Sequence, residues 1–292
     1  MGRARVVNDL LLCVGAQKSG TTWLYNRLAA HPEMRRATHK ELHYFSTVHC
    51  GGRLGPTIKM NAMKRMIARH PQQVAKFIQS QATGEKPPRE VMRVFRPFND
   101  SWYVNVFAGT GRYAMDFTPE YAKLPDEGHD HIKRLSKQQK IIFIMREPVD
   151  RALSAIRYVF RNSGRDIQTA TEAEVLEVAR KPVIVKLSEY ENTIDTLERN
   201  YSPDDIRILF YESMMAEKAN TLNALCEWLD IEPSNLPPDE LEQRDNSTDA
   251  FNPSAAIVEE LRDKLLPVRA AIEARFPEAR AAWADVTATL GS

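Results

Sequence analysis

The sequence predicts an α/β protein in which helices cover both faces of a central, mainly parallel sheet. Short apolar runs that end at a glycine, a proline or a charged residue alternate with helical segments along the chain. This alternation is typical of parallel strands joined by crossover helices. The first apolar run also leads through a glycine turn into a helix, which is the setting of a phosphate-binding loop. We expect one domain over residues 1–292.

The elements follow in order from these patterns. The predicted strands are 9–15, 33–38, 111–119, 140–148 and 205–212. Helices are predicted over 21–32, through much of 57–107, and over 149–162, 170–199, 213–230, 254–274 and 277–289. The polar, proline-containing stretches 83–90 and 233–254 are predicted to be irregular.

Ligands of such sheets bind at the carboxyl ends of the strands. The segments that directly follow the predicted strands should therefore hold the functional residues. These segments are 15–22, 39–46, 116–120, 146–154 and 211–212.

The composition of the chain limits the kinds of partner that we expect it to bind. The formal net charge is +1, so no strong overall field favours nucleic acid, and an anion site must be local. No stretch approaches the roughly 20 apolar residues of a membrane span, and we expect a soluble, cytoplasmic protein that contacts no membrane. Cys13, Cys50 and Cys226 are too few and too scattered for a disulfide framework or a zinc site.

The glycine turn departs from the usual nucleotide-binding loop, G-x-x-x-x-G-K-[ST]. Gly15 and Gly20 hold the glycine positions, but Thr21 stands where the lysine should be, and Lys18 precedes the second glycine. The strong strand 140–145 ends in Arg146 rather than in a magnesium-binding aspartate. The pattern favours two separate phosphate groups and no metal.

Two motifs carry a resemblance to a known family. "QKSGTTWL" and "MREPVDRALSAIRY" together resemble the sulfotransferases that use 3′-phosphoadenosine-5′-phosphosulfate (PAPS), in a bacterial-like soluble form. The resemblance implies a three-layer P-loop fold with additional C-terminal helices. It implies that Arg146 and Ser154, eight residues apart, hold the 3′-phosphate of PAPS and of its product, adenosine 3′,5′-bisphosphate. It also implies that the 5′-phosphosulfate is bound by Lys18, Ser19, Gly20, Thr21, Thr22 and Trp23.

A third motif, "KELHYFS", resembles the carbohydrate-modifying, heparan-type branch of that family. The resemblance implies that Glu41 is the general base, and we expect burial to raise its pKa. It also implies that His43 orients the base or the acceptor. From the residues alone, a surface pair between Glu41 and Lys40 stays open. Phe117, where some relatives carry lysine, favours a less charged acceptor.

Further candidates follow from position. Asp116 is an alternative base, and Arg244, Asn246 and Ser247 occupy the place of a donor-covering loop. The expected function is transfer of a sulfuryl group to a hydroxyl or amine of a small-molecule, carbohydrate or natural-product acceptor. The alternatives are a P-loop kinase that uses ATP and magnesium, and a non-catalytic nucleotide-binding module.

Overall fold

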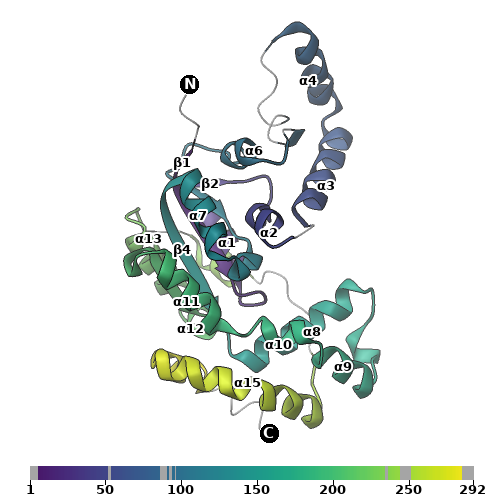
Figure 1. The fold of residues 1–292 in the computed structure, drawn as a ribbon, viewed down its shortest axis with the longest axis vertical. Coiled ribbons are helices and arrows are strands. Elements are labelled where there is room, and N and C mark those ends of the chain that lie inside the picture. Colours follow the sequence, from purple (N-terminus) through teal and green to yellow (C-terminus); the bar gives the residue numbers. More distant parts are fainter. Residues whose placement is uncertain are drawn as a thin grey trace. The chain divides into compact units, whose positions relative to one another are not determined.

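Five strands form one sheet in the computed structural model of the chain, which describes residues 6–51, 54–85, 91, 94–95, 97–233, 236–243 and 251–284. The strands are β1 (Val7–Gly15), β2 (Met34–Arg36), β3 (Tyr113–Asp116), β4 (Ser136–Met145) and β5 (Ile206–Phe210). Their order in the sheet is β2-β3-β1-β4-β5, and Figure 1 labels β1, β2 and β4. β3 pairs in parallel with both β1 and β2. The predicted α/β fold with a central, mainly parallel sheet is confirmed.

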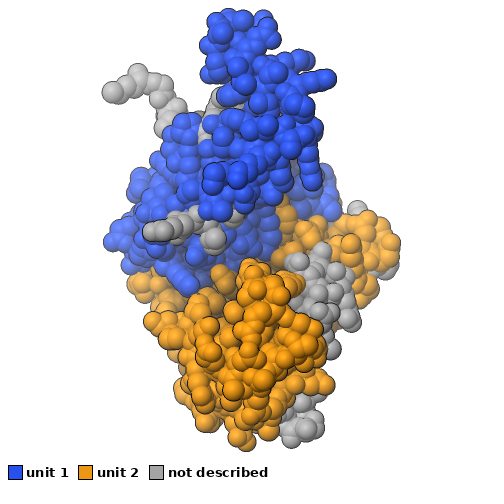
Figure 2. Space-filling view, turned by 90° about the vertical axis from the view of Figure 1, so that its right-hand side faces the viewer, with its two compact units in different colours: residues 1–12, 29–141 blue, residues 13–28, 142–292 orange. Residues whose placement is uncertain are grey.

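The chain divides into two compact units, residues 1–12 with 29–141 and residues 13–28 with 142–292 (Figure 2). We call them unit 1 and unit 2. Neither the division nor the sheet tests the expected single domain, which stays a prediction.

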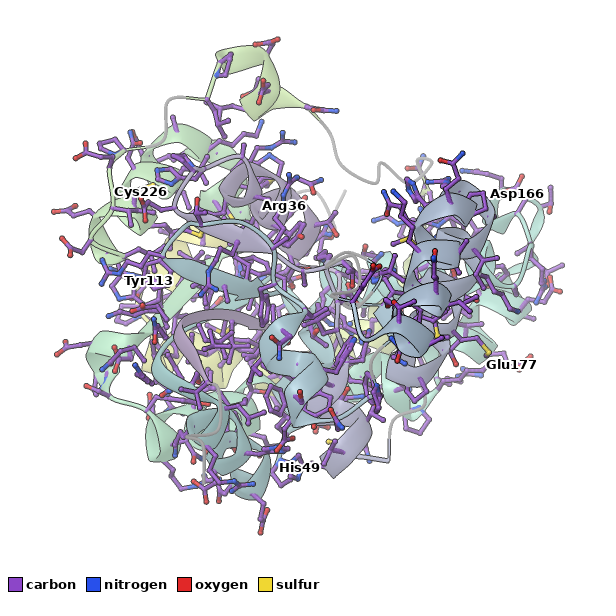
Figure 3. The ribbon with its side chains drawn as sticks, turned by 90° about the horizontal axis from the view of Figure 1, so that it is seen from above. Arg36, His49, Tyr113, Asp166, Glu177 and Cys226 are labelled. Carbon is purple, nitrogen blue, oxygen red and sulfur yellow. The ribbon has the colours of Figure 1, made fainter. Side chains whose placement is uncertain are left out.

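Unit 1 carries β2, β3 and a series of helices. The helical elements are α2 (Tyr44–His49), α3 (Leu54–Arg69), α4 (Pro71–Thr83), α6 (Asp100–Asn105), the 3-10 turn η1 (Pro119–Lys123) and α7 (Asp126–Leu135). α2 packs against α3, α7 and η1. Arg36, His49 and Tyr113, labelled in Figure 3, come from β2, α2 and β3.

Unit 2 begins at the carboxyl end of β1. Its helices are α1 (Thr21–Ala29), α8 (Pro148–Asn162), α9 (Glu172–Ala179), α10 (Pro182–Lys186), α11 (Tyr190–Asn200), α12 (Tyr211–Ala216), α13 (Lys218–Trp228), α14 (Pro238–Glu242), α15 (Ala255–Arg275) and α16 (Glu278–Ala282), with 3-10 turns η2 (Ile167–Thr169) and η3 (Pro203–Asp205). Buried apolar side chains of α8, α9, α10 and α15 form a shared core, including Ile156, Val175, Ile184 and Leu261.

Several elements differ from the sequence-based prediction: α7 was not predicted, the predicted helix 170–199 is divided into α9, α10 and α11, and three further differences lie toward the C-terminus. β5 ends at Phe210 because Tyr211 already begins α12. The predicted helix 213–230 is divided at Glu217, between α12 and α13. The stretch expected to be irregular contains α14, where Pro238 opens a turn and acidic residues follow, an arrangement that favours a helix start.

The described part of the chain contains no helix that is both long and apolar enough to cross a membrane. Arg244, Asn246 and Ser247 lie outside the described residues.

Candidate active site

The glycine turn between β1 and α1 is held tightly within unit 2. The amide of Ala16 donates to the carbonyl of Ile144 at 2.8 Å, which fixes the start of the turn against β4. Gly20 has φ +78°, and a Cβ added there would meet Met214 and Tyr211 at 2.8 Å. Only glycine fits such a position without strain. The turn therefore leads directly into the N-terminus of α1.

An anion could bind at this helix start. The first amides of a helix have no carbonyl partner within the helix, and the helix dipole places partial positive charge beside them. Ser19 is fully buried, and its Oγ has no hydrogen-bond partner among the described residues. The amide of Ser19, by contrast, donates to the carbonyl of Ala16 at 3.3 Å. The hydroxyl of Ser19, rather than its amide, is the group in this turn that an anion could engage.

Lys18 stands beside this turn in a left-handed backbone conformation, with φ 71°. Its Nζ lies 4.5 Å from the centroid of the Tyr158 ring, which belongs to α8. A cation over an aromatic face is attracted by the ring quadrupole. This contact positions the displaced lysine next to the helix that follows β4.

Arg146, at the end of β4, points toward the same turn. Its Nη1 donates to the carbonyl of Lys18 at 3.4 Å, and its Nη2 pairs with Asp150 at 3.1 Å. The guanidinium also lies 4.5 Å from the Tyr211 ring centroid. Its Nε is buried and has no partner among the described residues. The structure thus brings together the two motifs that the sequence singled out, and it leaves a charged donor open between them.

One face of α8 continues this cationic region. Asp150, Ser154 and Arg157 are spaced i, i+4 and i+7, so they lie along one side of the helix. Ser154 is buried, with 6% of its surface exposed. Burial and the nearby Arg146 both lower the pKa of Arg157, and its buried Nε has no partner in the described structure. Arg157 was missed by the sequence analysis, although its spacing from Ser154 could have indicated it.

A buried network supports the turn behind Arg146. Glu147 caps α8 by accepting from the amide of Asp150 at 2.8 Å. Glu212 accepts from the amide of Glu147 and from the indole of Trp283, each at 3.0 Å. Burial raises the pKa of Glu147 to about 7, although the amide of Asp150 opposes this shift. Contacts from Glu212 and Trp283, in the C-terminal part of unit 2, therefore hold the turn between β4 and α8 that positions Arg146.

Trp23 lies on α1 and is buried, with 5% of its surface exposed. Its indole N–H donates to the carbonyl of Leu241 at 3.2 Å, and Arg27 donates to the carbonyl of Gln243 at the same distance. This face of α1 holds the C-terminal end of α14 and the residue that follows it. A contact of Trp23 with the donor stays a prediction, as do the roles of Thr21 and Thr22.

In unit 1, the second group of predicted residues forms a chain of hydrogen bonds. Glu41 Oε1 lies 3.1 Å from Lys40 Nζ, and Glu41 Oε2 lies 3.1 Å from His43 Nε2. His43 Nδ1 lies 2.9 Å from Oε2 of Glu120, a residue of η1. The side chain of His43 is 4% exposed, those of Glu41 and Glu120 37% and 22%. Glu120 was missed by the sequence analysis, because nothing local marks a partner 77 positions away.

The electrostatics of Glu41 correct one expectation. Burial does raise the pKa of Glu41, but the hydrogen bonds from His43 and Lys40 and their positive charges outweigh burial. The net pKa of Glu41 is lowered, so the predicted raised value is wrong. The pair with Lys40 that the sequence left open does form, and it coexists with the contact to His43.

The backbone around Glu41 and His43 is fixed by Asp116 and its neighbours. Thr118 Oγ1 and Tyr121 Oη each donate to Asp116, at 2.7 and 2.9 Å. The same two oxygens accept backbone amides, Thr118 from Leu42 at 2.9 Å and Tyr121 from Tyr44 at 3.0 Å. Burial raises the pKa of Asp116 to about 6, against the opposing effect of these hydroxyls. Asp116 has no exposed surface, so its role here is to hold the loop rather than to reach a substrate.

Phe117 does not support an inference about the acceptor. Its side chain is completely buried, and its amide donates to the carbonyl of Lys40 at 3.2 Å. The expectation of a less charged acceptor therefore gains no support from Phe117 and stays a prediction.

The two groups differ in the chemistry they can perform. The turn and α8 in unit 2 present cations, a helix N-terminus and open donors, which suit phosphate or sulfate oxygens. The residues of unit 1 present an ionised carboxylate that can accept a proton. No group of three or more histidine, cysteine or acidic side chains in the described ranges is arranged to hold a metal ion.

Comparisons with known proteins agree with this chemistry. A model of the sulfotransferase family matches residues 11–235. A solved sulfotransferase from Alicyclobacillus acidocaldarius is 18% identical, with 92% of this chain and 96% of that chain covered and a TM-score of 0.58. A second, from Mycobacterium avium, is 14% identical, with 94% and 78% covered and a TM-score of 0.50. At such identities these two structures show the fold. A search of curated proteins gave no match.

Proposed function

Because this chain belongs to the sulfotransferase family, and is thus an enzyme that transfers sulfuryl groups, we propose that its donor is PAPS and its acceptor a hydroxyl or amine. The acceptor belongs to a small molecule, a carbohydrate or a natural product. The observation that carries the proposal is the open, buried Nε of Arg146 beside the glycine turn. A guanidinium that is held in place and has an unused donor suits a phosphate group.

The donor's two ends call for two anion sites. The helix start after Gly20, the hydroxyl of Ser19 and Lys18 bind the 5′-phosphosulfate in this proposal. Arg146 and Ser154 bind the 3′-phosphate, and Arg157 adds a further cation on the same face of α8. A 3′-phosphate distinguishes PAPS from ATP, so these residues also give the enzyme its preference between nucleotides.

Transfer then proceeds in line. The acceptor oxygen or nitrogen attacks sulfur, and the bond from sulfur to the bridging oxygen of the donor breaks with its electron pair on the leaving phosphate. Lys18 stabilises the charge that grows on that oxygen. Glu41 takes the proton from the attacking group. Its lowered pKa keeps it ionised, and therefore able to accept a proton, throughout the neutral range.

Nucleotide preference tests the donor assignment. We expect adenosine 3′,5′-bisphosphate to raise the melting temperature far more than AMP, or ATP with magnesium. Ligand at a hundredfold excess over Kd stabilises the folded state by about 2.7 kcal/mol. Equal shifts with AMP and the bisphosphate would contradict the proposal. A larger shift with ATP and magnesium would indicate a kinase.

Turnover tests the acceptor side. Labelled PAPS incubated with pooled alcohols, amines and sugars should give a labelled product, and the transfer should persist in EDTA if no metal is required. Bisphosphate binding without transfer to any acceptor would favour a non-catalytic nucleotide-binding module instead.

A further inference from the structure

His43 lies between two carboxylates, of which only one belongs to the candidate base. Its Nε2 is 3.1 Å from Glu41 and its Nδ1 is 2.9 Å from Glu120. Both carboxylates can only accept hydrogen bonds when they are ionised. A neutral imidazole has one N–H and one lone pair, so it could satisfy only one of them. With both carboxylates ionised, only the doubly donating imidazolium form of His43 satisfies both contacts.

The ring is also prevented from turning away. His43 has a left-handed backbone, with φ 51°, at the residue before α2. Its amide and that of Leu42 donate to Thr118 Oγ1, at 3.4 and 2.9 Å. Such a backbone is strained for a residue other than glycine, and it persists only where the surroundings determine it. Here the hydrogen bonds that Asp116 organises supply that determination.

The charged groups around His43 balance one another. Glu41 and Glu120 face its two ring nitrogens, and Lys40 neutralises the far oxygen of Glu41. Asp116, buried behind the loop, also interacts with the charge of His43. Burial lowers the pKa of His43, but hydrogen bonds and charges from Glu41 and Glu120 outweigh burial and raise it. The protonated form that satisfies both contacts is therefore also the form that the charges favour.

We propose that Glu120 is a positioning residue that holds His43 as imidazolium, and that this imidazolium in turn orients Glu41 as the base. This inference rests on the proposed function, in which Glu41 takes the acceptor's proton.

The proton is accounted for without a change at His43. As the acceptor attacks sulfur, its proton moves to Glu41, while both ring N–H groups of His43 continue to donate, Nε2 to Glu41 and Nδ1 to Glu120. The side chain of Glu41 is 37% exposed, so Glu41 then releases the proton to water and is again ionised. No oxidant, metal or further reactant takes part.

The first test needs no acceptor. Side-chain NMR of the full-length protein should show a His43 titration midpoint above the usual value of about 6.5. The signal is identified by its loss in His43→Gln. In Glu120→Gln, which keeps the size of the side chain but not its charge, the midpoint should move to lower pH. Glu85→Gln, at an exposed glutamate of the same unit, is the matched control and should leave the midpoint unchanged.

The second test is kinetic. Glu120→Gln should lower kcat by about tenfold, in the range typical for a residue that orients another functional group. The KM for PAPS should stay at the wild-type value, because the carboxylate of Glu120 is engaged by His43 and is not part of the proposed donor site. A purely structural role would instead reduce stability without moving the His43 midpoint.

Two results would overturn the role of Glu120. One is a His43 midpoint that is the same in Glu120→Gln and in the wild type. The other is a kcat for Glu120→Gln equal to that of Glu85→Gln while the wild type transfers sulfuryl groups. A wild type that transfers to no acceptor would contradict the proposed function itself, so the two failures are distinguishable.

Discussion

The residues proposed to bind the donor and those proposed to act on the acceptor differ in how their polar atoms are paired. In unit 2, Ser19, Arg146 and Arg157 each keep a buried donor atom without a partner in the described structure. In unit 1, Glu41, His43 and Glu120 engage one another in an unbroken chain. Burying an unpaired polar group costs about 1 to 3 kcal/mol. A region that keeps several such groups is prepared for a ligand that brings its own oxygen atoms, whereas a region that moves a proton needs its groups already connected.

The largest expected effect is on the acceptor side. Glu41→Gln keeps the shape of the side chain but cannot accept a proton, and general-base catalysis contributes typically 10²- to 10⁴-fold. We expect kcat, measured by transfer from labelled PAPS, to fall by about that range. Since the pKa of Glu41 is lowered from 4.5, the wild-type rate should decline on acidification only below that pH, as Glu41 becomes protonated. A mutant within a few-fold of the wild type would place the base elsewhere.

The next largest effect is expected for Lys18, on the donor side. Lys18→Ala should lower kcat by about 10²- to 10³-fold, as is typical for loss of a group that stabilises developing charge. Donor affinity should change less, because contacts that strengthen only in the transition state act on kcat. Lys137→Ala, at an exposed lysine of β4, is the control. A loss of affinity with unchanged kcat would mean that Lys18 binds the ground state alone.

Arg146→Ala should act on binding rather than on chemistry. Hydrogen bonds to charged groups contribute about 1.5 to 3 kcal/mol, so affinity for adenosine 3′,5′-bisphosphate should fall by roughly 10- to 150-fold while affinity for AMP changes little. Calorimetric titration with both nucleotides measures this difference. Arg275→Ala, at a surface arginine paired with Asp195 and Glu198, should bind like the wild type. Equal losses for AMP and the bisphosphate would remove Arg146 from the 3′-phosphate.

The smallest expected effect is on stability and concerns Glu147, which caps α8 next to Arg146. The pKa of Glu147 is raised to about 7 in the folded chain from an ordinary 4.5, so the folded state holds a proton that the unfolded state has released. Stability should therefore fall as pH rises, by about 1 kcal/mol between pH 6 and pH 8. Urea unfolding at both values checks this. Glu147→Gln should lose that part of the pH dependence, and an unchanged dependence would assign it to other groups.

Local signals allowed much of the fold to be predicted. The buried run 10–14, the left-handed Gly20 and the helix-opening Pro148 act within a few residues, so β1, α1, β4 and α8 follow from the sequence. The partner of His43 could not be predicted, because Glu120 reaches it only after β2 and β3 have paired. The lowered pKa of Glu41 comes from Lys40 and His43, one and two residues away, because the fold turns both side chains onto its carboxylate.

Two further residues that the sequence singled out are held by contacts that it does not show. Trp23 matches the family motif, but its indole donates to Leu241, more than 200 residues away. Phe117 follows a strand end, but the side chain points into the core. A position directly after a strand therefore indicates where functional residues are concentrated. Which side chains are exposed at such positions depends on packing.

The separation of roles is the central claim, and calorimetric titration of Glu41→Gln with adenosine 3′,5′-bisphosphate tests it most directly. If unit 2 binds the nucleotide and Glu41 only accepts a proton, the variant should bind the bisphosphate with the wild-type Kd and still discriminate against AMP. Loss of bisphosphate binding in this variant would show that Glu41 supports donor binding or the fold, and would contradict the assignment of proton transfer alone to Glu41.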